Sequence, residues 1–267
     1  MSADEPLLLR ALRSAPETLA LAPLEPVTVA VLDSGIDGSH GLLRGRVVQS
    51  FSAVISQGRA VMEPTDPAAN NDRYGHGTAV ASILAKLAPN AKLVDLRVLG
   101  DRALGTSAAL VAALKFAIEQ RFSVINLSVA ASSELAQSLH LLCERAYRQG
   151  QTVVAATRNM PLADHGYPAE LSSVVSVDSV AISALYAVHY RRTHPIEYAA
   201  AGANIEVAAA GGGLSTATGS SFAAPTVSAL CALWLGAFPG LRPFEIKSLL
   251  KAFALVDPVF DDRFSAL

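Results

Sequence analysis

The stretch that decides the fold is VTVAVLDSG, residues 27–35. Its continuous run of apolar and β-branched residues, Val27 to Leu32, is typical of a strand buried on both faces of a parallel sheet. Asp33 follows at the carboxyl end of this run, and Gly35 permits a sharp turn beyond it. A buried strand that ends in an acid and a turn points to an α/β fold.

Similar apolar runs alternate with helical periodicity along the rest of the chain. We expect further strands at residues 92–98, 124–127 and 152–156, and helices near residues 75–86, 106–120 and 133–149. Residues 172–180, 182–190 and 205–209 are β-rich and irregular, and helices near residues 221–235 and 242–253 close the domain. This alternation predicts one α/β domain of three layers, a parallel sheet flanked by helices. Residues 1–26 are expected to be an N-terminal extension, 27–255 the main domain and 256–267 a C-terminal tail.

Composition limits the kinds of partner. The 267 residues are 51% hydrophobic and 16% charged, which suits a large buried core, and the formal net charge is −2. No run of Lys or Arg is present, so a nucleic-acid partner is not expected. Cys143 and Cys231 both lie in apolar helical patterns and are interpreted as reduced core residues. We expect a cytoplasmic protein, or a secreted one if a leader and a pro-segment have been removed.

The stretch between Val207 and Leu241 contains no charged residue and no His, which raises the question of a membrane span. Glycines at 211–213 and Pro225 interrupt it, and the apolar run that remains, Val227 to Phe238, is short for a bilayer. It suits a helix buried on all sides instead. The sequence therefore predicts no membrane contact.

Three turns carry reactive side chains. Asp33 ends the first strand, His76 lies in DRYGHGTA (72–79), and Ser221 lies in TGSSFAAP (218–225), just before an apolar helix. Alone, each has an ordinary interpretation as a turn residue, a structural histidine or a helix N-cap. Together they are the acid, imidazole and hydroxyl of an activated serine nucleophile, in the chain order Asp, His, Ser.

These motifs resemble those of the subtilisin-like serine proteases, the subtilases. The resemblance rests on Asp33-Ser34-Gly35, His76-Gly77-Thr78 and the run Gly219 to Pro225, and it covers the chain from about Val27 to Phe253. It implies the subtilisin-like fold and a serine endopeptidase that acts on peptides or proteins through an acyl-enzyme intermediate. Ser221 would attack the carbonyl, His76 would carry the proton, and Asp33 would orient the imidazole.

The resemblance also assigns binding residues. Asn159 matches the side chain that the family places beside the oxyanion, with the Ser221 backbone N–H as the second donor. Extended substrate is expected along two segments, Leu104–Gly105 and Ser128-Val129-Ala130. Arg158 is the further candidate binding residue, in the place of a family glycine.

Several residues depart from the family pattern. Ser220, Phe222 and Ala79 replace a family Thr, Met and His, and residues 128–131 read SVAA where the family usually reads Ser-Leu-Gly-Gly. The added Cβ atoms predict a narrowed pocket that prefers a small or unusually oriented residue before the scissile bond. Alternatively, Arg158 binds an acidic or C-terminal group of the substrate.

No metal or cofactor is expected. The calcium loop that many subtilases insert after the catalytic histidine has no counterpart between Ala79 and Ala91, and the other histidines show no ligand spacing. The first 26 residues are too few for the usual folding pro-domain, which favours a selective intracellular processing protease. The oligomeric state is left open.

Two other functions remain to be separated from this one. A catalytically silent peptide-binding module would keep the fold without turnover. An α/β-hydrolase esterase fits less well, because Ala223 breaks its Gly-x-Ser-x-Gly turn and the order of the triad differs.

Overall fold

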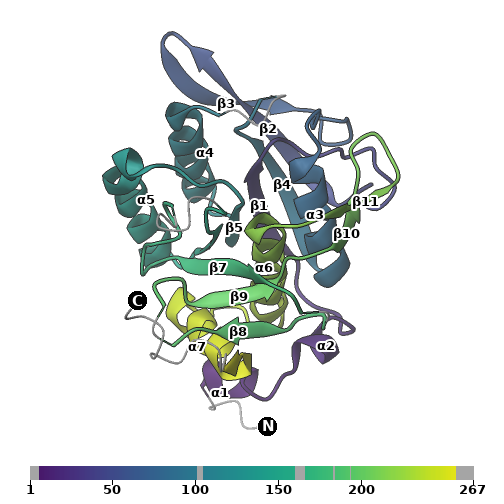
Figure 1. Ribbon diagram of the computed structural model, residues 1–267, viewed down its shortest axis with the longest axis vertical. Helices are drawn as coiled ribbons and strands as arrows, with labels where there is room; N and C mark the ends of the chain where they lie inside the picture. The colour runs from purple at the N-terminus through teal and green to yellow at the C-terminus, as the bar shows by residue number, and fades with distance from the viewer. Residues whose placement is uncertain (1–5, 101–104, 160–165, 183, 193, 257–267) are drawn as a thin grey trace.

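The computed structural model describes residues 6–100, 105–159, 166–182, 184–192 and 194–256 (Figure 1). Its centre is one mostly parallel sheet, in the order β12-β8-β9-β7-β6-β5-β1-β4-β2-β3. The strands in this order are β12 (Leu255–Val256), β8 (Val188–Tyr190), β9 (Tyr198–Ala201), β7 (Val175–Val180), β6 (Thr152–Ala156), β5 (Val124–Leu127), β1 (Val27–Asp33), β4 (Ala91–Arg97), β2 (Val47–Ser56) and β3 (Arg59–Thr65). The pairs β2–β3 and β8–β9 are antiparallel.

Helices cover both faces of the sheet, so the predicted three-layer α/β fold is confirmed (Figure 1). On one face α3 (His76–Leu87) and α6 (Ser220–Ala237) pack side by side, and α7 (Pro243–Phe253) joins their core. On the other lie α4 (Ser107–Glu119) and α5 (Ala136–Arg148), the latter preceded by a 3₁₀ turn, η1 (Ser133–Leu135). Each face of the sheet has its own hydrophobic core, and alternate residues of β1 belong to different cores. Val29 and Val31 lie in the core with α3 and α6, and Ala30 and Leu32 lie in the core with α4 and α5.

The uncharged stretch of the sequence forms the buried helix α6. Cys231 and Trp234 are fully buried, and burial raises the pKa of the Cys231 thiol to about 12, so this cysteine stays a neutral core residue. Among the described residues α6 alone is long and apolar enough to cross a membrane, yet 89% of it is buried inside the protein. A two-stranded sheet, β10 (Ile205–Ala208) with β11 (Leu214–Ala217), precedes it.

The hairpin of β2 and β3 was not predicted. It extends the sheet beyond β4, and its strands alternate only weakly between buried and exposed residues. The turn of this hairpin is formed by Gln57 and Gly58. Both residues have positive φ, which is the geometry of a two-residue type I′ turn. Gln-Gly is a less common sequence for this turn than Asn-Gly or Asp-Gly, which is why the sequence pattern gave no signal.

The described part of the N-terminal extension is packed against the main domain. It forms two short helices, α1 (Leu7–Ala11) and α2 (Pro16–Leu19), that contact α7 and α6, and Ala11 is fully buried. Glu25 N donates to Gly236 O at the C-terminal end of α6. At 1.5 Å per residue this end lies about 22 Å along the helix from Ser221, so this contact anchors the described part of the extension far from that serine. At the other end of the chain, Val256 of the expected tail pairs with Tyr190 in the sheet.

Asp95 is a carboxyl group buried in β4, beside Val31 of β1. Burial raises its pKa to about 7, helped by the charges of Asp72 and Asp33 and opposed by hydrogen bonds from Ser50 Oγ and the Ile36 backbone. Because the folded-state pKa lies above the ordinary 3.8, the protonated form favours folding. The contribution of the protonated Asp95 carboxyl to the free energy of unfolding is fully present below pH 3.8 and is lost as the pH rises through 7.

We therefore expect Asp95→Asn to stabilise the protein relative to wild type as the pH rises. Urea unfolding at each pH should show the difference in the free energy of unfolding grow by about 3 kcal/mol between pH 4.5 and pH 8. Asp66→Asn, an exposed acid in the loop after β3, is the matched control and should show no such trend. A difference between Asp95→Asn and wild type that stays constant over this range would contradict the prediction.

Candidate active site

Asp33 and His76 meet where β1 ends and α3 begins. Asp33 Oδ1 accepts hydrogen bonds from His76 Nδ1 and from Ser34 N, both at 2.7 Å. The close approach depends on Gly77, because a Cβ there would overlap Gly35 O and lie 3.0 Å from the Cβ of Asp33. The side chain of His76 is 20% exposed and that of Asp33 1%, so the acid lies behind the ring and the ring opens to solvent.

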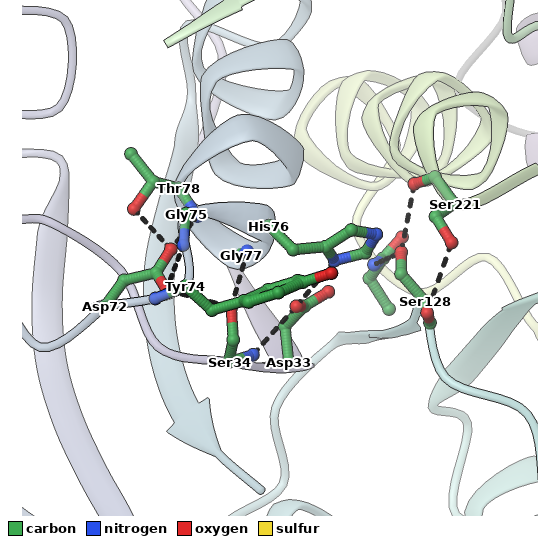
Figure 2. A network of polar contacts seen from close by, with 11 residues as sticks. Asp33, Ser34, Asp72, Tyr74, Gly75, His76, Gly77, Thr78, Ser128 and Ser221 are labelled. Carbon is green, nitrogen blue, oxygen red and sulfur yellow. Dashed lines mark hydrogen bonds and ion pairs between the residues drawn. The ribbon is translucent and has the colours of Figure 1, made fainter. Parts of the chain in front are cut away.

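A second buried carboxylate, that of Asp72, connects the end of β1 with the start of α3 (Figure 2). Its Oδ1 accepts from Ser34 Oγ and from the Tyr74 and Gly75 amides, and its Oδ2 accepts from the amide and hydroxyl of Thr78. Ser34 Oγ in turn accepts from Gly77 N at 3.0 Å. Asp72 thus fixes the turn that carries His76 against the end of β1.

These charges set the protonation of His76. Burial by itself lowers the pKa of the imidazole, but the charge and hydrogen bond of Asp33 and the charge of Asp72 outweigh it, so the pKa lies above the ordinary value. A raised pKa keeps the ring protonated to higher pH. If neutral His76 acts as a base, activity should fall as the pH drops through this pKa.

We expect Asp72→Asn to shift the acid limb of the pH profile of kcat/KM to lower pH, because one charge that raises the His76 pKa is removed. The amide nitrogen of the new Asn side chain would also face the Thr78 N–H. Two hydrogen-bond donors would then meet, which should destabilise the fold by about 1–3 kcal/mol. Rates from pH 5 to 9 measure the shift, with exposed Asp66→Asn as the control of equal charge. An unchanged acid limb in folded Asp72→Asn would contradict the assignment.

Ser221 lies at the start of α6, opposite His76. Figure 2 shows the edge of the imidazole that faces away from Asp33 directed toward Ser128 and Ser221. Ser221 Oγ donates to Ser128 O at 3.3 Å, while Ser128 Oγ donates to Ser221 O at 3.1 Å. The ring of Phe222 packs on that of His76, with centroids 5.2 Å apart. Asp33, His76 and Ser221, from three distant motifs, are thus brought together at one edge of the sheet.

The two neighbouring serines of this turn have different surroundings. Ser220 is fully buried, and its hydroxyl donates to Thr157 O at 2.7 Å and is placed 3.0 Å from Asn159 Oδ1. Ser221 is only partly buried and lies on the side of His76. Geometry therefore favours Ser221 as the reactive hydroxyl and gives Ser220 a supporting position.

Asn159 follows β6 and lies next to this turn. Its Oδ1 accepts from Ser220 N at 3.1 Å and contacts the Ser220 hydroxyl. These bonds assign the amide orientation and leave Nδ2, with two N–H groups, as the end that can donate to a substrate. The side chain is exposed, as a group that meets substrate must be.

The two segments expected to bind substrate lie on either side of a cavity of about 430 Å³. Gly105 pairs with Leu99 in an antiparallel bridge, while Leu104 lies outside the described residues. The opposite wall is the segment at residues 129–132, after β5, and just before it Asn126 Nδ2 of β5 donates to Ser128 Oγ. Apolar side chains on both walls line the cavity, among them Val98, Leu99, Leu110, Val129, Ala130 and Leu135.

Comparison with known proteins agrees with this geometry. Residues 25–266 match the model of the subtilase family. The chain belongs to the subtilase family. The resemblance inferred from the motifs is thereby confirmed.

Curated relatives of this subtilase include subtilisin DY from Bacillus licheniformis, 30% identical over 241 residues that cover 85% of this chain and 83% of subtilisin DY. Subtilisin E from Bacillus subtilis (strain 168) is also 30% identical over 85% of the chain, but the match spans 60% of its length. The major intracellular serine protease of the same organism is 29% identical over 78% of this chain and 67% of its own.

Solved structures show the same likeness. Sphericase superimposes with a TM-score of 0.71 at 25% identity, and S41 psychrophilic protease with 0.67 at 25% identity. In both cases the match covers 84% of this subtilase and 81% of the other chain.

The sequence interpretation missed two residues that organise this subtilase site. Both lie inside the quoted motifs, but Asp72 was given no role and Ser220 was interpreted only as a departure from the family pattern. A signal existed for Asp72, an acid four positions before His76 in a Gly-rich turn, where carboxylates often accept backbone N–H groups. The hydrogen-bond partner of Ser220 is Asn159, and the spacing of residues along the sequence does not predict this contact.

Among the described residues, no three His, Cys, Asp or Glu side chains come together as a metal site would require. That no metal is needed stays a prediction.

Proposed function

We propose that this subtilase is an active serine endopeptidase that cleaves peptide bonds through an acyl-enzyme on Ser221. The observation that carries the proposal is the 2.7 Å hydrogen bond from His76 to Asp33, with the other edge of the same ring facing Ser221. An imidazole held in this way has one nitrogen fixed as donor and the other available as base.

The reaction follows from these positions. Ser221 Oγ turns from Ser128 O toward His76, attacks the peptide carbonyl and gives its proton to the imidazole. Asn159 Nδ2 and the Ser221 N–H stabilise the oxyanion. Collapse of the intermediate breaks the C–N bond, and His76 protonates the departing amine. Water, activated by the same ring, then releases the acyl group and restores Ser221.

The substrate is a peptide or protein segment in extended conformation. It would pair by main-chain hydrogen bonds with the segments at Gly105 and at Ser128–Ala130, beside the 430 Å³ cavity. We further propose a selective processing role inside the cell. The bulk that Ala130 and Arg158 add beside the site supports selectivity, and the relative named as an intracellular serine protease supports the location.

A fluorophosphonate probe tests turnover chemistry directly, because it reacts only with an activated serine. Wild type should be labelled at one site, and Ser221→Ala should not be labelled. Folded wild type that takes no label, but binds peptides, would instead identify a silent binding module. Circular dichroism melts of both proteins establish that each is folded.

A further inference from the structure

The hairpin of β2 and β3 ends the central sheet with an open edge. β3 is the last strand in the order of the sheet, and Figure 1 shows the hairpin projecting beyond α4 at one end of the molecule. Four residues of β3 are exposed, Arg59, Val61, Glu63 and Pro64. A strand edge of this kind is a template for pairing with a strand of another chain.

The register of the hairpin shows which backbone groups of β3 point outward. Ser56 pairs with Arg59 across the two-residue turn, so these two residues exchange both of their backbone hydrogen bonds. Because hydrogen bonding alternates along antiparallel strands, Ala60, Met62 and Pro64 direct their backbone groups to the open edge. Among the described residues, none bonds to the outward N–H and C=O of Ala60 or Met62. The edge therefore keeps its capacity to pair.

The side chains of β3 suit an antiparallel pairing of this strand with itself. If Ala60 lies opposite Met62 of a second copy, that pair and its symmetry mate each exchange two backbone hydrogen bonds. Arg59 then lies opposite Glu63 of the second copy on one face, and Val61 lies opposite Val61. Neither Arg59 nor Glu63 has an ion-pair partner among the residues that the structure describes. The strand thus complements itself in charge.

A shift of this register in either direction loses contacts. If Met62 lay opposite Met62, Pro64 would lie opposite Ala60 and would offer no N–H to it. If Ala60 lay opposite Ala60, the turn residue Gly58 would have to pair as a strand residue. Both shifts also separate the opposite charges, so one register is favoured.

Helix α4 leaves room for the second copy. Phe116 of α4 packs on Phe51, with ring centroids 4.7 Å apart, in the half of the hairpin farther from the turn. Ile55 lies on the same face nearer the turn and is 64% exposed. In an antiparallel pair, the covered half of one hairpin lies beside the open half of the other. The two α4 helices therefore lie on opposite sides of the twofold axis.

We propose that β3 is a self-association surface, through which two copies of this subtilase pair antiparallel about a twofold axis. One sheet then continues through both copies, and association ends at the dimer because each copy uses the same edge. The paired strands are short and bury little area, so the dimer is weak and exchanges with the monomer.

Charge exchange between copies tests this surface. Sedimentation velocity from about 1 to 500 µM should show a reversible monomer–dimer equilibrium for wild type. Arg59→Glu alone and Glu63→Arg alone each place like charges opposite one another, and each should raise the dissociation constant at least about tenfold. An equal mixture of the two variants should form dimers of one copy of each, because every facing pair again has opposite charges.

Two further variants complete the test. Met62→Pro removes an outward N–H and leaves the bonds to β2, so it should weaken the dimer at least about tenfold. Arg44→Glu is the matched charge reversal, since Arg44 is exposed in the turn before β2 and lies outside β3. It should keep the dissociation constant within about twofold of wild type.

Three results would overturn the proposal. They are a wild type that stays monomeric at every concentration, assemblies larger than a dimer, and a mixture of Arg59→Glu with Glu63→Arg that associates no better than either variant alone. Circular dichroism melts establish that each variant is folded. Peptidase activity plays no part in these measurements, so their outcome is separate from that of the proposed function.

Discussion

Substitution of Ser221 by Ala is expected to lower kcat by on the order of 10⁶-fold, the size of loss known for removal of the nucleophile of subtilisin. The reason is that no acyl-enzyme can form once Oγ is absent, whatever the positions of Asp33 and His76. KM should change little, since the Ser221 side chain bonds only to Ser128 O in the described structure. Steady-state kinetics on one well-cleaved peptide measure both constants.

Ser220→Ala is the matched control, an identical change one position earlier on the same helix. The Ser220 hydroxyl contacts Thr157 O and Asn159 Oδ1, and its loss leaves the Ser220 N–H to hold Asn159. We expect a loss of about tenfold in kcat, because the net contribution of one hydrogen bond is about 1 kcal/mol. Equal losses in the two variants would remove the assignment of Ser221 as nucleophile.

The second large effect is expected for Asp33→Asn, a fall in kcat of about 10⁴-fold, as for the same change in chymotrypsin-like proteases. Ser34 N and His76 Nδ1 both bond to Oδ1 of Asp33, so the amide oxygen of the variant can keep both hydrogen bonds, but the negative charge is lost. Without that charge, the imidazolium that forms when His76 takes the proton of Ser221 is no longer stabilised. Stopped assays near pH 8 would measure the loss.

Asp37→Asn serves as the control for this substitution. Asp37 lies in the same turn after β1, but its carboxylate accepts from Ser39 and from Gly211 N instead of from His76. Its hydrogen bonds with these groups keep the Asp37 pKa below its ordinary value despite burial, so the variant should lose stability and retain kcat within a few-fold. Asp33→Asn activity within tenfold of wild type would show that the proton moves without this carboxylate.

The sequence predicted the central strands well because their apolar runs are continuous. The strand ranges 124–127 and 152–156 were placed at their observed bounds, and α6 was predicted within two residues. The β2–β3 hairpin was missed, since half-exposed strands joined by Gln57-Gly58 lack both a clear period and the usual turn residues.

The side chains of the candidate site were named from motifs, but their connections were not. Ser34 bonds to Asp72 across 38 positions and Ser220 to Asn159 across 61, and no local pattern encodes such separations. The N-terminal helices were missed for a related reason: α1 and α2 are too short to show periodicity, and their burial depends on α6 and α7.

Because residues of β1 pack in two cores, the position of the catalytic candidate Asp33 depends on packing on both sides of the sheet. Val31 and Leu32, the residues before Asp33, are each fully buried, one in each layer. A small rearrangement in either layer therefore tilts the strand end and displaces the carboxylate from its imidazole partner. The turnover rate is therefore more sensitive to changes in core packing than the melting temperature is. A shift of the carboxylate by a fraction of an ångström disturbs its alignment with the imidazole well before the chain unfolds.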